Sequence, residues 1–204
     1  DWSVSTVLDT TVVATKSNKS CRATSGRVEV CNKTYGWNGW LGLAQVWVYA
    51  TGHIAQGTVK MNDTYFNLPT YNNSNERRHV MCQEIGHTLG LDHQSEDGSS
   101  QDTCMDYFSN TGANATSAQS TKPNPHDYDQ LGAIYTHLDS TNTISLSTDD
   151  GGRGKPATVG QDIDLNDPSA WGKAVRQDAR GNNSLYERDL GKGEKLFTFV
   201  FWAE

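Results

Sequence analysis

The sequence predicts an α+β protein, because segments with strand character lie toward both ends of the chain and helical patterns lie between them. Residues 27 to 63 and 184 to 202 are rich in β-branched and aromatic residues, as strands are. Apolar residues recur at helical spacing in two stretches between residues 74 and 138. A chain of 204 residues can bury a sizeable core and need not contain more than one domain.

Strand segments are expected throughout the first 63 residues. These are an opening strand or strand pair at 2–14, strands at 27–32 and 43–49, and an edge strand at 53–63. Gly57 indicates a bulge or a close backbone approach in the last of them. No long amphipathic helix can be read in residues 1 to 50.

A helix is expected to begin near Ser74. Asn73, followed three residues later by Glu76, is typical of an N-terminal capping pair. Gly90 can adopt a positive φ and would end the helix. Between these limits, apolar side chains recur every four residues, which predicts a core-facing stripe of Met81, Ile85 and Leu89.

The C-terminal part combines a second helix with a predicted hairpin. Pro125 favours a helix start, and Asp127 suits the first turn. Residues 184–190 and 195–202 are expected to pair around a glycine-rich turn at 191–193. Because the run LFTFVFW is too apolar to be exposed, we expect residues 141–204 to form a β-hairpin extension packed on residues 1–140.

Residues 79 to 93 read HVMCQEIGHTLGLDH and bring together side chains that can bind a metal. On a helix, Gln83 and His87 lie four residues apart and share a face, with Glu84 beside them. A turn at Gly90 would bring His93 to the same point. This spacing follows the logic of the HExxHxxGxxH zinc motif, with Gln83 at its first position.

The motif resembles that of the metzincin zinc endopeptidases. Met105 adds to the resemblance, because it follows His93 by twelve residues in TCMDY, where that clan has its Met-turn. The resemblance covers about residues 1 to 140 and is strongest from 79 to 107. It implies a metzincin-like catalytic domain over residues 1–140, with a twisted, mostly parallel sheet, an active-site helix, a Met-turn and a C-terminal helix.

Carried over residue by residue, the resemblance implies a zinc ion held by Gln83, His87 and His93. Zinc would activate a water molecule, and Glu84 would act as its general base. The reaction implied is hydrolysis of peptide bonds in a protein or peptide substrate. Met105 would form a hydrophobic floor beneath the metal and would not be a ligand.

Two residues in this region leave alternatives open. Tyr107 matches a position at which some metzincins have a tyrosine near the metal and the reacting oxyanion; a structural tyrosine in the Met-turn is the alternative. Gln83 offers a neutral carbonyl oxygen, a weaker donor than imidazole, so zinc affinity or reactivity would be reduced. The alternative function is therefore an inactive homologue that acts as a binding or structural protein. Retention of Glu84 favours the peptidase, because an inactive protein has no chemical need for it.

The four cysteines favour two disulfides. The natural pairs are Cys21 with Cys31 and Cys82 with Cys104, although four cysteines allow three connectivities. A bond between the second pair would join the helix to the Met-turn. Free thiols or a cysteine metal site are alternatives, but the even count and the absence of a CxxC spacing favour disulfides and an oxidising, extracellular compartment.

The acidic composition disfavours two classes of partner. A net charge of −7 and a pI of about 5.3 argue against nucleic acid and against anionic membranes. No segment approaches transmembrane length, and no signal peptide opens the chain at Asp1, so we expect a mature, secreted monomer. Calcium is a second candidate cofactor. No EF-hand pattern joins its candidate ligands, so acidic loops exposed to solvent are the favoured interpretation. The candidate ligands are Asp149, Asp150, Asp162, Asp164 and Asp167.

Overall fold

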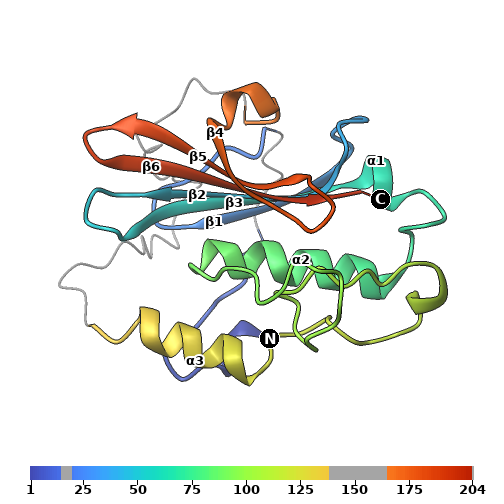
Figure 1. Cartoon of the computed structure of the whole chain (residues 1–204). Coiled ribbons are helices and arrows are strands. Elements are labelled where there is room, and N and C mark those ends of the chain that lie inside the picture. Colours follow the sequence, from blue (N-terminus) through green and yellow to red (C-terminus); the bar gives the residue numbers. More distant parts are fainter. Residues whose placement is uncertain (15–19, 138–164, 204) are drawn as a thin grey trace.

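One mixed β-sheet dominates the fold, and two helices lie beneath it in successive layers (Figure 1). The computed structural model describes residues 1–14, 20–137 and 165–203. Helix α2 (Ser74–Thr88) packs against the sheet, and α3 (Pro125–Ile134) lies on the far side of α2. The predicted α+β class is therefore confirmed.

The sheet of the described residues has six strands in the order β1-β3-β2-β6-β5-β4. Their bounds are Val28–Lys33, Trp40–Val48, Ile54–Asn62, Lys173–Gln177, Asn183–Gly191 and Glu194–Trp202 for β1 to β6. Within this sheet only β1 and β3 pair in parallel, so the expectation of a mostly parallel sheet is wrong. Short turns join β2 to β3 and β5 to β6, and such turns connect antiparallel neighbours, whereas parallel neighbours need a long crossover.

Strand β3 lies inside the sheet and not at its edge. It pairs with β1 on one side and with β2 on the other, so the segment 53–63 is a strand as predicted but is not an edge strand. Its residues after Ile54 are all buried. Gly57 marks a close backbone approach, because a Cβ atom there would lie 3.0 Å from Thr88 Cγ2 of α2.

The predicted helix limits are confirmed by their caps. Asn73 Oδ1 accepts a hydrogen bond of 2.9 Å from the Glu76 amide at the start of α2, and Gly90 follows the helix with a φ of +93°. Helix α3 begins at Pro125, where the preceding residue and Asp127 form a capping box. The remaining helical segments are α1 (Asp63–Phe66) and the 3-10 turns η1 (Trp2–Val4), η2 (Gly112–Asn114) and η3 (Pro168–Ala170). No helix in the described part of the chain is long and apolar enough to cross a membrane.

The opening segment is not the strand that its composition predicts. Residues 2–4 form η1, and residues 5–14 contain no strand. Trp2 is buried in a cluster with Cys82, Met105 and Leu131. Packing of this one large side chain beneath α2 positions the segment, and it outweighs the β propensity of its neighbours.

Both faces of α2 are covered. Gln83, Glu84 and His87 are each about 1% exposed beneath the sheet, whereas the predicted core stripe from Met81 to Leu89 is only half-buried. The polar face is therefore the more deeply buried of the two. Its burial depends on the C-terminal strands, which extend the sheet over the helix.

Strands β5 and β6 form the predicted hairpin, with the turn at residues 191–193. Strand β6 then pairs antiparallel with β2 over its whole length. Residues 173–202 consequently continue the same sheet as residues 28–62. This pairing brings a C-terminal strand directly beside the strand that lies over α2 (Figure 1).

Candidate active site

The two histidines of the motif meet beneath the sheet. His87 comes from the last turn of α2, and the turn at Gly90 returns the chain so that the His93 ring lies 4.5 Å from the His87 ring, centroid to centroid, at 81°. His87 Nδ1 donates a hydrogen bond of 2.9 Å to the Leu91 carbonyl oxygen. The tautomer that makes this bond leaves the lone pair on Nε2.

Glu96 orients the second histidine. Its Oε1 lies 2.5 Å from His93 Nδ1, so this nitrogen carries the proton and Nε2 carries the lone pair. Burial, reinforced by the charge of Arg176, lowers the pKa of His93 to about 3. Burial likewise lowers the pKa of His87 well below its usual value. Both imidazoles are therefore neutral at pH 7 and can act as metal ligands through Nε2.

Gln83 has the amide orientation that a ligand requires. Its Nε2 donates a hydrogen bond of 2.7 Å to the Asp106 carbonyl oxygen, while its buried Oε1 has no hydrogen-bond partner in the described structure. A buried carbonyl oxygen without a partner is costly. The orphaned oxygen, on the same helix face as His87, is a donor available to a cation.

Glu84 lies next to Gln83, pressed against β2. Neither of its carboxylate oxygens makes a well-formed hydrogen bond within the described residues. Burial raises the pKa of Glu84 well above its usual value, and the nearby Ala44 backbone lowers it by a smaller amount. Gly42 makes this approach possible. A Cβ atom there would lie 2.6 Å from Glu84 Oε1 and 2.4 Å from Val80 Cγ1.

The predicted disulfides are present. Cys82 is bonded to Cys104, and Cys21 is bonded to Cys31. The first of these bonds joins α2 to the segment that contains Met105. Met105 is fully buried beside the helix, since a Cβ atom on Gly86 would come within 2.5 Å of its sulfur. Met105 is thus part of the apolar floor beneath α2.

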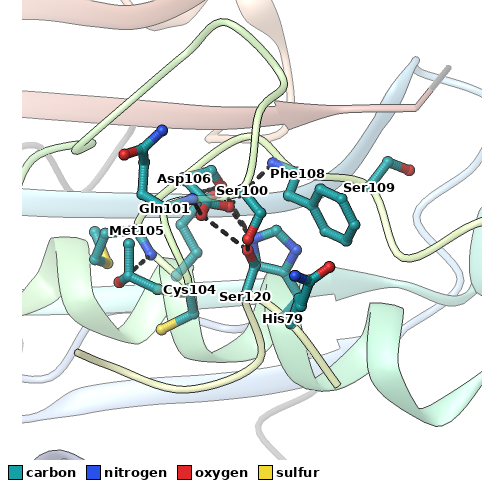
Figure 2. Close-up of polar contacts among 12 residues, drawn as sticks. His79, Ser100, Gln101, Cys104, Met105, Asp106, Phe108, Ser109 and Ser120 are labelled. Carbon is teal, nitrogen blue, oxygen red and sulfur yellow. Dashed lines mark hydrogen bonds and ion pairs between the residues drawn. The ribbon is translucent and has the colours of Figure 1, made fainter. Parts of the chain in front are cut away.

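Asp106 organises the turn after Met105 (Figure 2). Its buried carboxylate accepts hydrogen bonds from the backbone N–H of Gln101 at 2.6 Å, the Ser120 hydroxyl at 2.8 Å and the backbone N–H of Phe108 at 3.0 Å. Its carbonyl oxygen accepts from Gln83 and lies 3.0 Å from His79 Nε2. Sequence reasoning missed this residue, although a lone acid between Met105 and Tyr107 was a signal.

Both ring nitrogens of His79 are engaged by the segment after Met105. Its Nδ1 contacts Asn110 Oδ1 at 3.1 Å, and its Nε2 contacts the Asp106 carbonyl oxygen, so both nitrogens are engaged by the turn. The ring of Phe201 packs against it edge-on, with 5.5 Å between centroids. His79 therefore holds the Met105 segment against the start of α2.

Tyr107 lies beside the histidines, but its hydroxyl is engaged elsewhere. Its ring packs edge-on against His93 with 4.7 Å between centroids. The hydroxyl donates a hydrogen bond of 2.9 Å to the Val200 carbonyl oxygen of β6. Burial raises the pKa of Tyr107 well above its usual value, so the phenol stays protonated and acts as a donor. In this structure the Tyr107 hydroxyl makes a structural contact with β6, and its ring packs against His93.

Strand β6 covers the rings of His87 and Tyr107. Phe199 stacks on His87 with 3.9 Å between ring centroids and 9° between planes. Phe201 stacks on Tyr107 with 5.2 Å and 4°. The sequence predicts that this apolar strand packs on residues 1–140, but nothing in it indicates that the strand lies over the site.

A second C-terminal contact was also unforeseen. Arg176 of β4 reaches back to the loop after His93, where its Nη1 lies 2.5 Å from Asp92 Oδ2 and its Nε lies 2.9 Å from Glu96 Oε1. Ser184 of β5 also donates to Glu96, at 3.3 Å. The residue that orients His93 is thus held by the C-terminal strands.

No family model, curated protein or solved structure matches this chain. The resemblance to metzincins therefore stays a prediction from the residues of the motif.

The described residues contain no group of three His, Cys, Asp or Glu side chains that could hold a metal ion. The two imidazoles of His87 and His93 lie together, and the unpartnered amide oxygen of Gln83 lies one helical turn before His87 on α2. Of the calcium candidates, Asp149, Asp150, Asp162 and Asp164 lie outside the described residues, and Asp167 caps η3 by accepting from the Ser169 amide at 2.9 Å.

Proposed function

We propose that this protein is a secreted, zinc-dependent endopeptidase. The unpartnered oxygen of Gln83 carries the proposal, because a buried amide that donates through its nitrogen and leaves its oxygen orphaned needs a cation or a donor at that place. The Nε2 lone pairs of His87 and His93 are the other two donors. Two imidazoles and an oxygen are a ligand set that zinc accepts.

Glu84 is the group that would move the proton. When bound, zinc would polarise a peptide carbonyl and lower the pKa of a water molecule. Glu84 lies next to the ligand Gln83 on α2, and its elevated pKa suits a group that takes a proton from water and returns it to the leaving amine. Its carboxylate is buried and makes no well-formed hydrogen bond within the described residues, although the Ala44 backbone lies close enough to lower its pKa. This weak structural engagement supports a chemical role for Glu84.

The disulfides support the proposed extracellular compartment. Two disulfides in a chain of 204 residues are typical of an oxidising environment, and this supports a secreted protein. The acidic net charge supports a protein or peptide substrate rather than a nucleic acid.

A catalytically inactive binding or structural protein is the second candidate. The observation that favours it is the cover of Phe199 over His87, together with glutamine at the first ligand position. The two candidates differ in metal-dependent turnover. Casein digestion with and without a chelator separates them, when it is measured on zinc-loaded wild type and on zinc-loaded Phe199→Ala, which lacks the ring that covers His87.

We expect zinc affinity to follow the residue at position 83. Gln83→Ala should weaken zinc binding at least about tenfold, because it removes one of three donors, and Gln83→His should strengthen it, because imidazole is the better donor. Equilibrium competition against a calibrated chelator measures both. Gln130→Ala, a change of the same type at an exposed position of α3, is the matched control and should leave the affinity unchanged. Equal affinities for all four proteins would exclude Gln83 as a ligand.

A further inference from the structure

Strand β6 presents a stripe of aromatic side chains to the candidate site. Phe197, Phe199 and Phe201 lie opposite Val46, Ala44 and Gly42 of β2. Directly opposed residues in an antiparallel pair point to the same face, and Gly42 faces Glu84 of α2. The phenylalanines therefore point toward α2, as the stacking of Phe199 on His87 and of Phe201 on Tyr107 shows.

The other face of β6 has a different environment. Leu196 is fully buried in a cluster with Trp47, and Val200 is buried in a cluster with Trp40 and Trp171. These contacts build the core on the side of the sheet away from α2. The phenylalanine stripe can thus be altered separately from the contacts that hold β6 in this second core.

The C-terminal strands also engage the polar groups of the site. Val200 accepts the hydrogen bond of the Tyr107 hydroxyl, and Arg176 and Ser184 hold Glu96, the partner of His93. The aromatic stripe covers the ring of His87 at the same time. A substrate cannot reach the Nε2 atoms of the histidines and Glu84 along this side while β6 is in place.

Strand β6 holds the position that an extended peptide would need. It pairs antiparallel with residues 40–48 of β2, the strand directly above Glu84. Without β6, β2 would be an edge strand with unpaired backbone groups next to the ligands. Such an edge binds an extended peptide by adding it to the sheet.

We infer that β6 is an internal inhibitor of the proposed peptidase site, occupying the substrate strand position on β2 until it is displaced. The inference rests on the proposed function and adds its regulation. Substrate and β6 compete for one edge, so the resting chain is latent. The peptide that replaces β6 is extended and carries apolar, preferably aromatic, side chains at alternate positions, as β6 does.

Weakening the stripe in the full chain tests this inference. Phe199→Ala removes the ring over His87 and should raise hydrolysis of an aromatic-rich peptide library at least about tenfold. The reason is that the substitution destabilises the state with β6 docked more than the state with β6 displaced. A synthetic peptide of residues 194–203 should inhibit this variant, and the same peptide with serine at its three phenylalanine positions should not. Leu131→Ala, which truncates a buried side chain of α3 far from β6 in the sequence, controls for general destabilisation.

A second measurement tests how accessible His87 and His93 are and does not depend on peptide hydrolysis. In zinc-free protein, diethyl pyrocarbonate should label His87 and His93 slowly in the wild type and much faster in Phe199→Ala, with exposed His126 as the internal reference. Circular dichroism and mapping of the Cys82–Cys104 bond establish that each variant is folded.

The outcomes separate the inference from the proposed function. Equal and measurable turnover of the wild type and Phe199→Ala, or wild-type His87 labelled as fast as His126, overturns the inhibitory role and leaves the peptidase assignment intact. If Phe199→Ala exposes His87 and binds zinc yet hydrolyses no peptide, the peptidase proposal fails, and the inhibitory role fails with it.

Discussion

Glu84→Gln is expected to reduce peptide hydrolysis by about 10² to 10⁴-fold, the usual contribution of a general base. The amide has the same shape but cannot take a proton from water. Zinc affinity should stay within about twofold of the parent, because Glu84 is not among the proposed donors. Thermal stability should not fall, since burial raises the pKa of Glu84 and a neutral side chain avoids the cost of a buried charge.

The measurement is made in both the wild type and Phe199→Ala, so that latency of the resting chain does not hide the effect. Initial rates on a fluorogenic peptide library, chelator competition for zinc and thermal unfolding give the three readouts. Asp129→Asn, the same carboxylate-to-amide change at an exposed position of α3, is the matched control and should alter none of them. Near-parental turnover of Glu84→Gln would remove Glu84 from the mechanism.

The double substitution Cys82→Ser/Cys104→Ser is expected to lower the free energy of unfolding by about 3 kcal/mol. The bond closes a loop with a sequence separation of 22 residues, and Cys104 lies in the fully buried cluster beneath α2. Its loss should also weaken zinc binding, because the turn that holds the Gln83 amide through Asp106 is then tied to the helix only by hydrogen bonds and packing. Urea unfolding and chelator competition measure the two effects.

Cys21→Ser/Cys31→Ser provides the comparison. This bond closes a loop with a sequence separation of 10 residues and should cost a similar free energy on the chain-entropy model. It joins the segment before β1 to β1 itself, away from α2, so zinc affinity should not change. If both double variants weaken zinc binding equally, the loss reflects global stability and not a specific staple between α2 and Met105.

Local features of the candidate site could be predicted from the sequence because they depend on residues close together in the chain. Gln83 and His87 share a helix face by their spacing, and the turn at Gly90 brings His93 beside His87. The amide orientation of Gln83 was also predictable, because only the oxygen of an amide has a lone pair for a metal. Whether a metal binds there stays a prediction.

Residues that support the ligands were harder to foresee. Glu96 follows His93 by three residues, and an acid at that spacing was an available signal for a partner of its Nδ1. Asp106 acts through its burial, which depends on Ser120 and Gln101 folding around it. Arg176 had no signal at all, since its contact with Glu96 spans 80 positions of the chain and depends on the path of β4.

The sequence by itself determined the caps of α2 and α3, the turn at Gly90 and the β5–β6 hairpin, because neighbours in the chain decide each of them. It favoured the two disulfide pairs over the other connectivities, and the structure contains these pairs. Only the tertiary structure decided that β2 lies between β3 and β6, that the sheet is mostly antiparallel, and that Phe199 covers His87. Strand pairing is a competition among edges distant in sequence. The sequence of an apolar strand such as LFTFVFW does not specify which strand it will pair with. Its pairing with β2 is what buries the candidate ligands.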